Sequence, residues 1–96
     1  MPKGYIIAHV TVNDPEAYKE YIRRDTPLLE AAGARPLVRG GQGETAEGHP
    51  FSRHVVFEFP SYDAARTFFY SEEYQEVARI RRETADSMIV LVEGVE

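Results

Sequence analysis

The chain has 96 residues, a formal charge of −5 and no cysteine, so we expect one domain with a small core. The missing cysteines exclude a disulfide scaffold, a thiolate zinc site and a cysteine nucleophile, and the acidic balance argues against a nucleic-acid partner. No apolar run approaches the ~20 residues of a membrane span. The N-terminal apolar run is too short for a signal peptide, which predicts a cytoplasmic protein.

The chain opens with a predicted strand over residues 5–12, which is rich in β-branched side chains. Asp14 follows as a helix N-cap, because its carboxylate can accept from free backbone N–H groups. Pro15 suits the first helical position, where its missing N–H costs nothing. The sequence therefore predicts a helix directly after the strand.

This helix contains an internal proline. Pro27 removes one N–H and crowds a carbonyl, so we expect a kink, or a restart capped by Thr26. Gly33 is expected to end the helix as a left-handed residue. A short second strand is predicted over residues 35–40, and the glycine-rich residues 40–51 predict a loop.

The second half repeats this plan. Residues 52–59 predict a third strand, and Ser61 and Ser71 are expected to cap two helical segments. Apolar residues at helical spacing extend to Ala85. The uninterrupted apolar run at 88–92 predicts the fourth strand.

The order β-α-β-β-α-β predicts an α+β, ferredoxin-like fold for a single domain over residues 1–96. We expect a four-stranded antiparallel sheet in the order 4-1-3-2, with the helices on one face because right-handed crossovers place them there. The residues expected beneath the helices are Ile6, Ala8, Val10, Val12, Val55, Phe57 and Phe59. The opposite face carries Ile7, Leu37, Val56 and part of the fourth strand, and a second copy packed sheet against sheet is its simplest cover.

Motifs along the whole chain resemble a small bacterial family, the domain of unknown function 1330 family of the dimeric α/β-barrel superfamily. They are Asp14-Pro15-Glu16-Ala17-Tyr18 with Tyr21, Arg39-Gly40-Gly41, Glu47-Gly48, Arg53-x-Val55-Val56-x-Glu58-Phe59-Pro60-Ser61, Phe68 with Ser71-x-x-Tyr74, Arg81, and Val92-Glu93-Gly94. The resemblance implies a homodimer whose two sheets close a barrel. Similar superfamily members include cofactor-free monooxygenases, haem-binding proteins, lactone isomerases and stress-response proteins. His54 departs from the family pattern, in which that position is usually apolar.

A small-molecule pocket between the sheet and the helices is predicted from polar side chains among apolar walls. Its candidate residues are His9, Tyr18, Tyr21, Arg39, His54, Glu58, Phe68 and Tyr74. We expect His9, Arg39 and His54 on the helix-free face. The alternative is that the histidines and Glu58 only satisfy one another at an interface between two copies.

Chemical roles follow from residue type. His9 is the weak candidate for a general base, since imidazole titrates near neutrality. Arg39 can clamp a carboxylate or form a salt bridge to Glu58, whereas Arg81 is expected to be a helix-dipole or ion-pair partner. His54 and Glu58 lie roughly 13 Å apart along one strand, so no metal site and no cofactor is predicted.

Three functions remain open from the sequence. The first is a homodimer that binds a small apolar or aromatic ligand. The second is a cofactor-independent monooxygenase or an isomerase with His9 as base, and the third is a structural or stress-related dimer without a ligand. The expected partners are a second copy and a small molecule, with neither nucleic acid nor a membrane.

Overall fold

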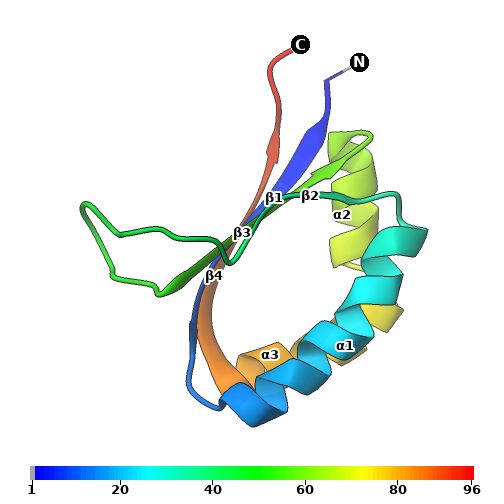
Figure 1. The fold of residues 1–96 in the computed structure, drawn as a ribbon. Coiled ribbons are helices and arrows are strands. Elements are labelled where there is room, and N and C mark those ends of the chain that lie inside the picture. Colours follow the sequence, from blue (N-terminus) through cyan, green and yellow to red (C-terminus); the bar gives the residue numbers. More distant parts are fainter. Residues whose placement is uncertain (1) are drawn as a thin grey trace.

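Four strands form one antiparallel sheet, and three helices cover one of its faces (Figure 1). The computed structural model describes residues 2–96. Its elements are β1 (Gly4–Val12), α1 (Pro15–Ala31), β2 (Arg35–Arg39), β3 (Arg53–Phe59), α2 (Tyr62–Phe69), α3 (Glu72–Thr84) and β4 (Ala85–Glu93). The strand order is β2-β3-β1-β4, so the predicted ferredoxin-like sheet is confirmed.

The helices begin at the side chains that the sequence marks. Asp14 Oδ1 accepts from the backbone N–H of Ala17 at 3.2 Å. Ser61 and Ser71 cap α2 and α3 in the same way, each with its hydroxyl oxygen accepting from a backbone N–H three residues on. Each bond satisfies a donor that has no partner inside the helix, which fixes where the helix starts.

The expected restart within α1 is wrong, because the helix is continuous from Pro15 to Ala31 with Pro27 inside it. Thr26 is not a cap, since its hydroxyl donates to the carbonyl of Ile22 at 2.8 Å. The buried stripe continues across the proline to Leu29, and this packing outweighs the lost N–H. The helix ends before Gly33, whose φ of 76° confirms the left-handed position.

Strand β4 starts three residues earlier than the sequence predicts, at Ala85 instead of residue 88. It pairs along the whole of β1, from Val12 opposite Ala85 to Gly4 opposite Glu93. Ala85 is therefore a sheet residue and not the last residue of a helical stripe. Apolar spacing cannot separate these two readings at a direct helix-to-strand junction.

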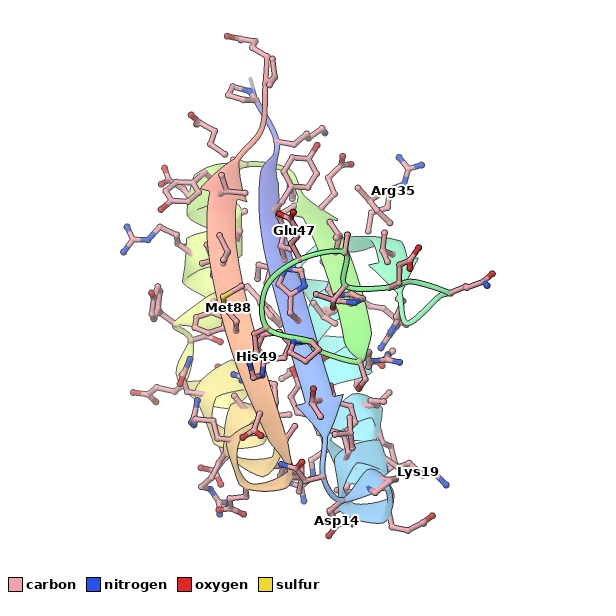
Figure 2. The ribbon with its side chains drawn as sticks, turned by 90° about the vertical axis from the view of Figure 1, so that its left-hand side faces the viewer. Asp14, Lys19, Arg35, Glu47, His49 and Met88 are labelled. Atoms are coloured by element: carbon pink, nitrogen blue, oxygen red, sulfur yellow. The ribbon has the colours of Figure 1, made fainter. Side chains whose placement is uncertain are left out.

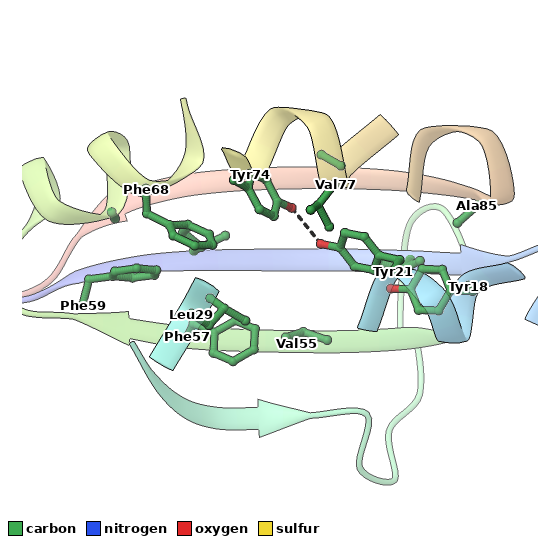
Figure 3. Packing of buried hydrophobic residues seen from close by; sticks show 14 residues of the cluster. Tyr18, Tyr21, Leu29, Val55, Phe57, Phe59, Phe68, Tyr74, Val77 and Ala85 are labelled. Atoms are coloured by element: carbon green, nitrogen blue, oxygen red, sulfur yellow. Dashed lines mark hydrogen bonds between the residues drawn. The ribbon is translucent and has the colours of Figure 1, made fainter. Parts of the chain in front are cut away.

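The core lies between the sheet and the helices (Figure 3). The side chains predicted beneath the helices are buried or half-buried there, and Phe59 and Val10 are almost fully enclosed. The Phe68 ring packs between those of Phe59 and Tyr74 at tilts of 40° and 39°, with centroids 5.4 and 4.8 Å apart. The face assignment made from strand periodicity is confirmed for β1 and β3.

In the described part of the chain, no helix lies on the opposite face of the sheet (Figures 1 and 2). Large apolar side chains stay exposed there, with Met88, Val90 and Val92 at 49%, 40% and 41%. The loop over residues 40–52 extends on this side and passes in front of the sheet (Figure 2). Within residues 2–96 no helix has the length and apolar character needed to cross a bilayer.

Candidate functional site

A cavity of about 50 Å³ lies between the helix-covered face of the sheet and helices α1 and α3. Its apolar wall includes Ala8, Val10 and Phe57 from the sheet and Ile22 and Leu29 from α1. A single water needs roughly 10–15 Å³ of such space, so the cavity has room for a small group. Five of the predicted residues line it: Tyr18, Tyr21, Arg39, Phe68 and Tyr74.

Tyr21 of α1 and Tyr74 of α3 meet across the cavity wall (Figure 3). Their hydroxyl oxygens are 2.7 Å apart, and one hydroxyl donates to the other. Burial raises the pKa of both phenols, that of Tyr21 well above its usual value, so both are neutral near pH 7. The pair uses one of its two protons internally, which leaves one hydroxyl able to donate.

Asp25 is a buried carboxyl on the cavity wall, with only 5% of its surface exposed. It lies one helical turn after Tyr21 on α1, and its Oδ1 has no hydrogen-bond partner among residues 2–96. Burial raises its pKa to about 7, although the positive charges of Arg39 and Arg81 oppose the shift. Asp25 therefore gains and loses its proton near neutral pH.

Arg81 reaches the same cavity from the last turn of α3 and is also 5% exposed. Its Nη1 donates to Ser87 Oγ at 2.6 Å, whereas its Nε has no partner in the described chain. Burial lowers its pKa, but the neighbouring phenols of Tyr74 and Tyr21 outweigh this and raise the pKa overall. Arg81 lies in the last turn of α3, as expected of a helix-dipole partner, but it forms no salt bridge within residues 2–96 and it also lines the cavity.

Arg53 supplies a third unpartnered atom. It begins β3, and its guanidinium lies against Gly40, where an added Cβ would collide with it. Its buried Nε has no hydrogen-bond partner among the described residues. Thus the buried side-chain polar atoms without partners in residues 2–96 belong to Asp25, Arg53 and Arg81, and all of these residues line one cavity.

Arg39 lies on the helix-covered side, so its expected place on the helix-free face is wrong. A register shift between Pro36 and Val38 moves every following residue of β2 to the other face. Val38 then lies opposite Val56, and Arg39 turns toward α1. Its Nη2 donates to Thr26 Oγ1 at 2.8 Å, and its guanidinium lies 5.4 Å from the Phe57 ring centroid. Arg39 is exposed, so it stands at the edge of the cavity.

The other three predicted residues lie on the helix-free face and do not line this cavity. His9 and His54 are paired across β1 and β3, with their Nδ1 atoms 2.9 Å apart, so one donates to the other. Glu58 accepts from the Tyr5 hydroxyl at 3.1 Å. The structure therefore divides the predicted set between two faces, and Arg39 does not meet Glu58.

Sequence reasoning missed Asp25 and Arg53 and undervalued Arg81. One signal was present for Asp25, because it follows Tyr18 and Tyr21 at helical spacing on the buried stripe of α1. A carboxyl on an apolar stripe needs a partner or a function. A similar signal was present for Arg53, because strand periodicity places it on the helix-covered face with Val55 and Phe57. Among residues 2–96, no three His, Asp or Glu side chains gather as metal ligands do.

The sequence model of the domain of unknown function DUF1330 matches residues 3–95. The chain belongs to the DUF1330 family. No sequence among the curated proteins matches it.

Solved structures share the fold of this DUF1330 chain at low identity. A protein of unknown function from Rhodopseudomonas palustris superposes with a TM-score of 0.76 at 19% identity, over 99% of this chain and 84% of that one. SnoaB, a cofactor-independent oxygenase from Streptomyces nogalater, gives 0.63 at 15%, over 100% and 96%. A dimeric ferredoxin-like protein of unknown function from Thermobifida fusca gives 0.62 at 18%, over 96% and 91%. At this identity the likeness establishes the fold alone.

Proposed function

We propose that this DUF1330 protein is a homodimer that binds a small ligand with an apolar or aromatic body in the cavity between the sheet and the helices. One observation carries the ligand part: Asp25, Arg53 and Arg81, which each hold a buried polar atom without a partner in residues 2–96, are residues of the same cavity lining. Each such atom costs about 1–3 kcal/mol of stability when it lacks a partner. Apolar side chains at these positions would fill a core at lower cost, so a ligand explains their presence.

The dimer part rests on the helix-free face. Exposed apolar side chains cluster on β4, where Met88, Val90 and Val92 share one side of the strand. A structure of the same fold from Thermobifida fusca is described as dimeric. His9, His54, Tyr5 and Glu58 on this face already have hydrogen-bond partners, so a second sheet would cover side chains that are at least partly satisfied. Light scattering on a sizing column tests this directly, and a monomer mass at micromolar concentration would contradict it.

Ligand binding is tested by NMR titration of the labelled protein with phenol, a neutral one-ring probe. We expect amide shifts in α1, α3 and the middle of β1. Ala8→Ile fills the cavity from the sheet side and should abolish the shifts, whereas Ala31→Ile adds the same atoms at an exposed position and should not. If no ring-bearing probe binds, charged or neutral, the cavity is only a packing defect and the structural dimer is the better hypothesis.

A second candidate is catalysis in the same cavity. It is favoured by a buried carboxyl with a pKa of about 7, because a general acid–base group works best near the ambient pH. In this candidate Asp25 replaces His9 as the base, since His9 faces the other side of the sheet and does not line the cavity. Turnover of quinols and lactones by wild type, Asp25→Asn and His9→Ala tests both bases. Equal turnover by all three would exclude both.

A further inference from the structure

The cavity wall offers more hydrogen-bond donors than acceptors. The Nε atoms of Arg53 and Arg81 are buried donors without partners in residues 2–96. The phenol pair of Tyr21 and Tyr74 has one more proton to donate than it uses internally. Among the residues of the wall, the buried acceptor without a partner in residues 2–96 is Asp25 Oδ1. A bound molecule must therefore supply mainly acceptor oxygens to satisfy the wall.

The charges of the cavity-lining side chains also favour a ligand that supplies acceptor oxygens. Guanidinium groups reach the cavity from three elements, Arg39 on β2, Arg53 on β3 and Arg81 on α3, and face the single carboxyl of Asp25. Arginine stays protonated in proteins, so this wall carries an excess of positive charge in a chain whose overall charge is −5. A buried cation among apolar side chains is costly unless an anion accompanies it.

Resting on the proposed function, we propose that the ligand is a small organic acid with a flat apolar body, whose carboxylate accepts hydrogen bonds from Arg53 and Arg81. A planar guanidinium fits the two oxygens of a carboxylate well. The aromatic side chains of Tyr18, Phe57 and Phe68 provide the apolar surface for the body. A cavity of about 50 Å³ is well below the roughly 150 Å³ that encloses a benzene ring, so the acid group is enclosed and the flat body occupies the open part of the pocket.

Asp25 controls how well such an anion is tolerated. Its surroundings are Arg39 from β2, Arg81 from α3, and the phenols of Tyr21 and Tyr74, all lining the same cavity. The pKa of Asp25 is raised to about 7, so its carboxyl is mostly neutral at pH 6 and can donate to a ligand oxygen. At pH 8 the ionised carboxyl repels an anionic ligand. Anion binding should therefore weaken as the pH rises through this window.

The experiment compares benzoate with benzamide by isothermal titration calorimetry on the intact wild-type protein. The two probes have the same shape, and only benzoate carries a charge, which it keeps at all pH values above about 6. At pH 6 we expect benzoate to bind about ten- to a hundredfold more tightly, the range of a charge-assisted hydrogen bond. Arg53→Gln should remove most of this preference. Arg82→Gln makes the same change at the exposed neighbour of Arg81 and should preserve it.

A pH series gives a second readout. We expect the wild type to lose benzoate affinity several-fold between pH 6 and 8, and Asp25→Asn to bind with the same affinity at both. His9, His49 and His54 lie outside the cavity lining, and the flat profile of Asp25→Asn separates the effect of Asp25 from any effect of these side chains. Arg81→Gln should also reduce the preference for benzoate. If this variant fails to fold because Arg81 is buried, Arg53→Gln still tests the carboxylate contact, because Arg53 is only half-buried.

The outcomes separate the two proposals. Benzamide binding as tightly as benzoate in the cavity would overturn the acid proposal and leave the small-ligand function standing. A benzoate preference that survives Arg53→Gln and Arg81→Gln unchanged would also overturn it, because the anion would then be bound elsewhere. Failure of benzoate, benzamide and phenol alike would overturn both proposals.

Discussion

The two faces of this sheet treat their polar side chains in opposite ways. On the helix-free face, His9 pairs with His54 and Tyr5 pairs with Glu58, although water can reach all of these side chains. On the helix-covered face, Asp25 and Arg81 are buried, and each keeps a polar atom that has no partner among residues 2–96. A polar group without a protein partner costs little stability where water reaches it and much more where it is buried. The observed arrangement, with pairs on the accessible face and unpaired atoms on the buried face, is therefore the reverse of the one that stability favours.

This contrast separates an interface from a site. Side chains that satisfy one another can be covered by a second copy without further adjustment. Buried side chains that stay unsatisfied beside a cavity need a molecule that completes their hydrogen bonds. The helix-free face thus suits assembly, and the helix-covered face suits binding.

The largest effect is expected from a charge on the helix-free face. Val90→Asp places a carboxylate in the middle of β4, where a partner sheet would bury it at a cost of several kcal/mol. We expect the mass measured by light scattering to fall from dimer to monomer. Val95→Asp makes the same substitution at a fully exposed residue beyond the strand and should remain dimeric. A dimer in both variants would assign assembly to another surface.

The next effect concerns the buried carboxyl on the other face. The pKa of Asp25 is raised from 3.8 to about 7, so between these values the folded protein holds a proton that the unfolded chain has lost. Stability therefore falls as the pH rises through this window, by about 4 kcal/mol at most. Asp25→Asn should remove this loss, so its free energy of unfolding in urea should exceed that of wild type at pH 8 but not at pH 4.

A matched control identifies the carboxyl responsible. Asp63→Asn removes an exposed acid from the first turn of α2 and should leave the pH dependence of stability nearly as in wild type. Parallel pH profiles for wild type and Asp25→Asn would show that Asp25 does not titrate near neutrality, which would also remove its proposed control of anion binding.

The sequence predicted the fold well because its signals are local. Asp14, Ser61 and Ser71 mark the helix starts, and strand periodicity assigns the faces of β1 and β3. It failed at β2, where one inserted residue reverses the faces and carries Arg39 to the cavity. A bulge has no reliable sequence signature. The alternation of side chains between the two faces, counted from the start of the strand, therefore cannot detect it.

The site was predicted only in part for a similar reason. Tyr18, Tyr21 and Tyr74 lie on regular helical stripes and could be placed from spacing. Arg81 falls on the same stripe as Tyr74, but its position near a helix end favoured a surface role. Whether a buried charge finds a partner depends on neighbours far away in the sequence, such as Ser87 on the next strand, and spacing alone does not give them.

A smaller effect is expected at the phenol pair. Tyr21→Phe removes the 2.7 Å hydrogen bond to Tyr74 while keeping the ring in the core, so we expect a loss of about 1 kcal/mol in the free energy of unfolding. Tyr70→Phe deletes a hydroxyl from a 62% exposed ring and should change stability by less than the error of the measurement. Equal stability of the two variants would mean that the buried pair adds nothing beyond the packing of its rings.

The smallest effect is expected from His54→Val, which places an apolar side chain on the helix-free face beside Val56 and Val38. The variant loses the contact with His9 Nδ1, but that nitrogen is only half-buried, so stability should fall by no more than about 1 kcal/mol. Because His54 lies across the sheet from the cavity and shares no partner with Arg53 or Asp25, benzoate affinity should stay within about twofold of wild type. A tenfold loss of affinity would show that the sheet transmits changes between its faces, and assembly and binding would then have to be treated as one coupled equilibrium.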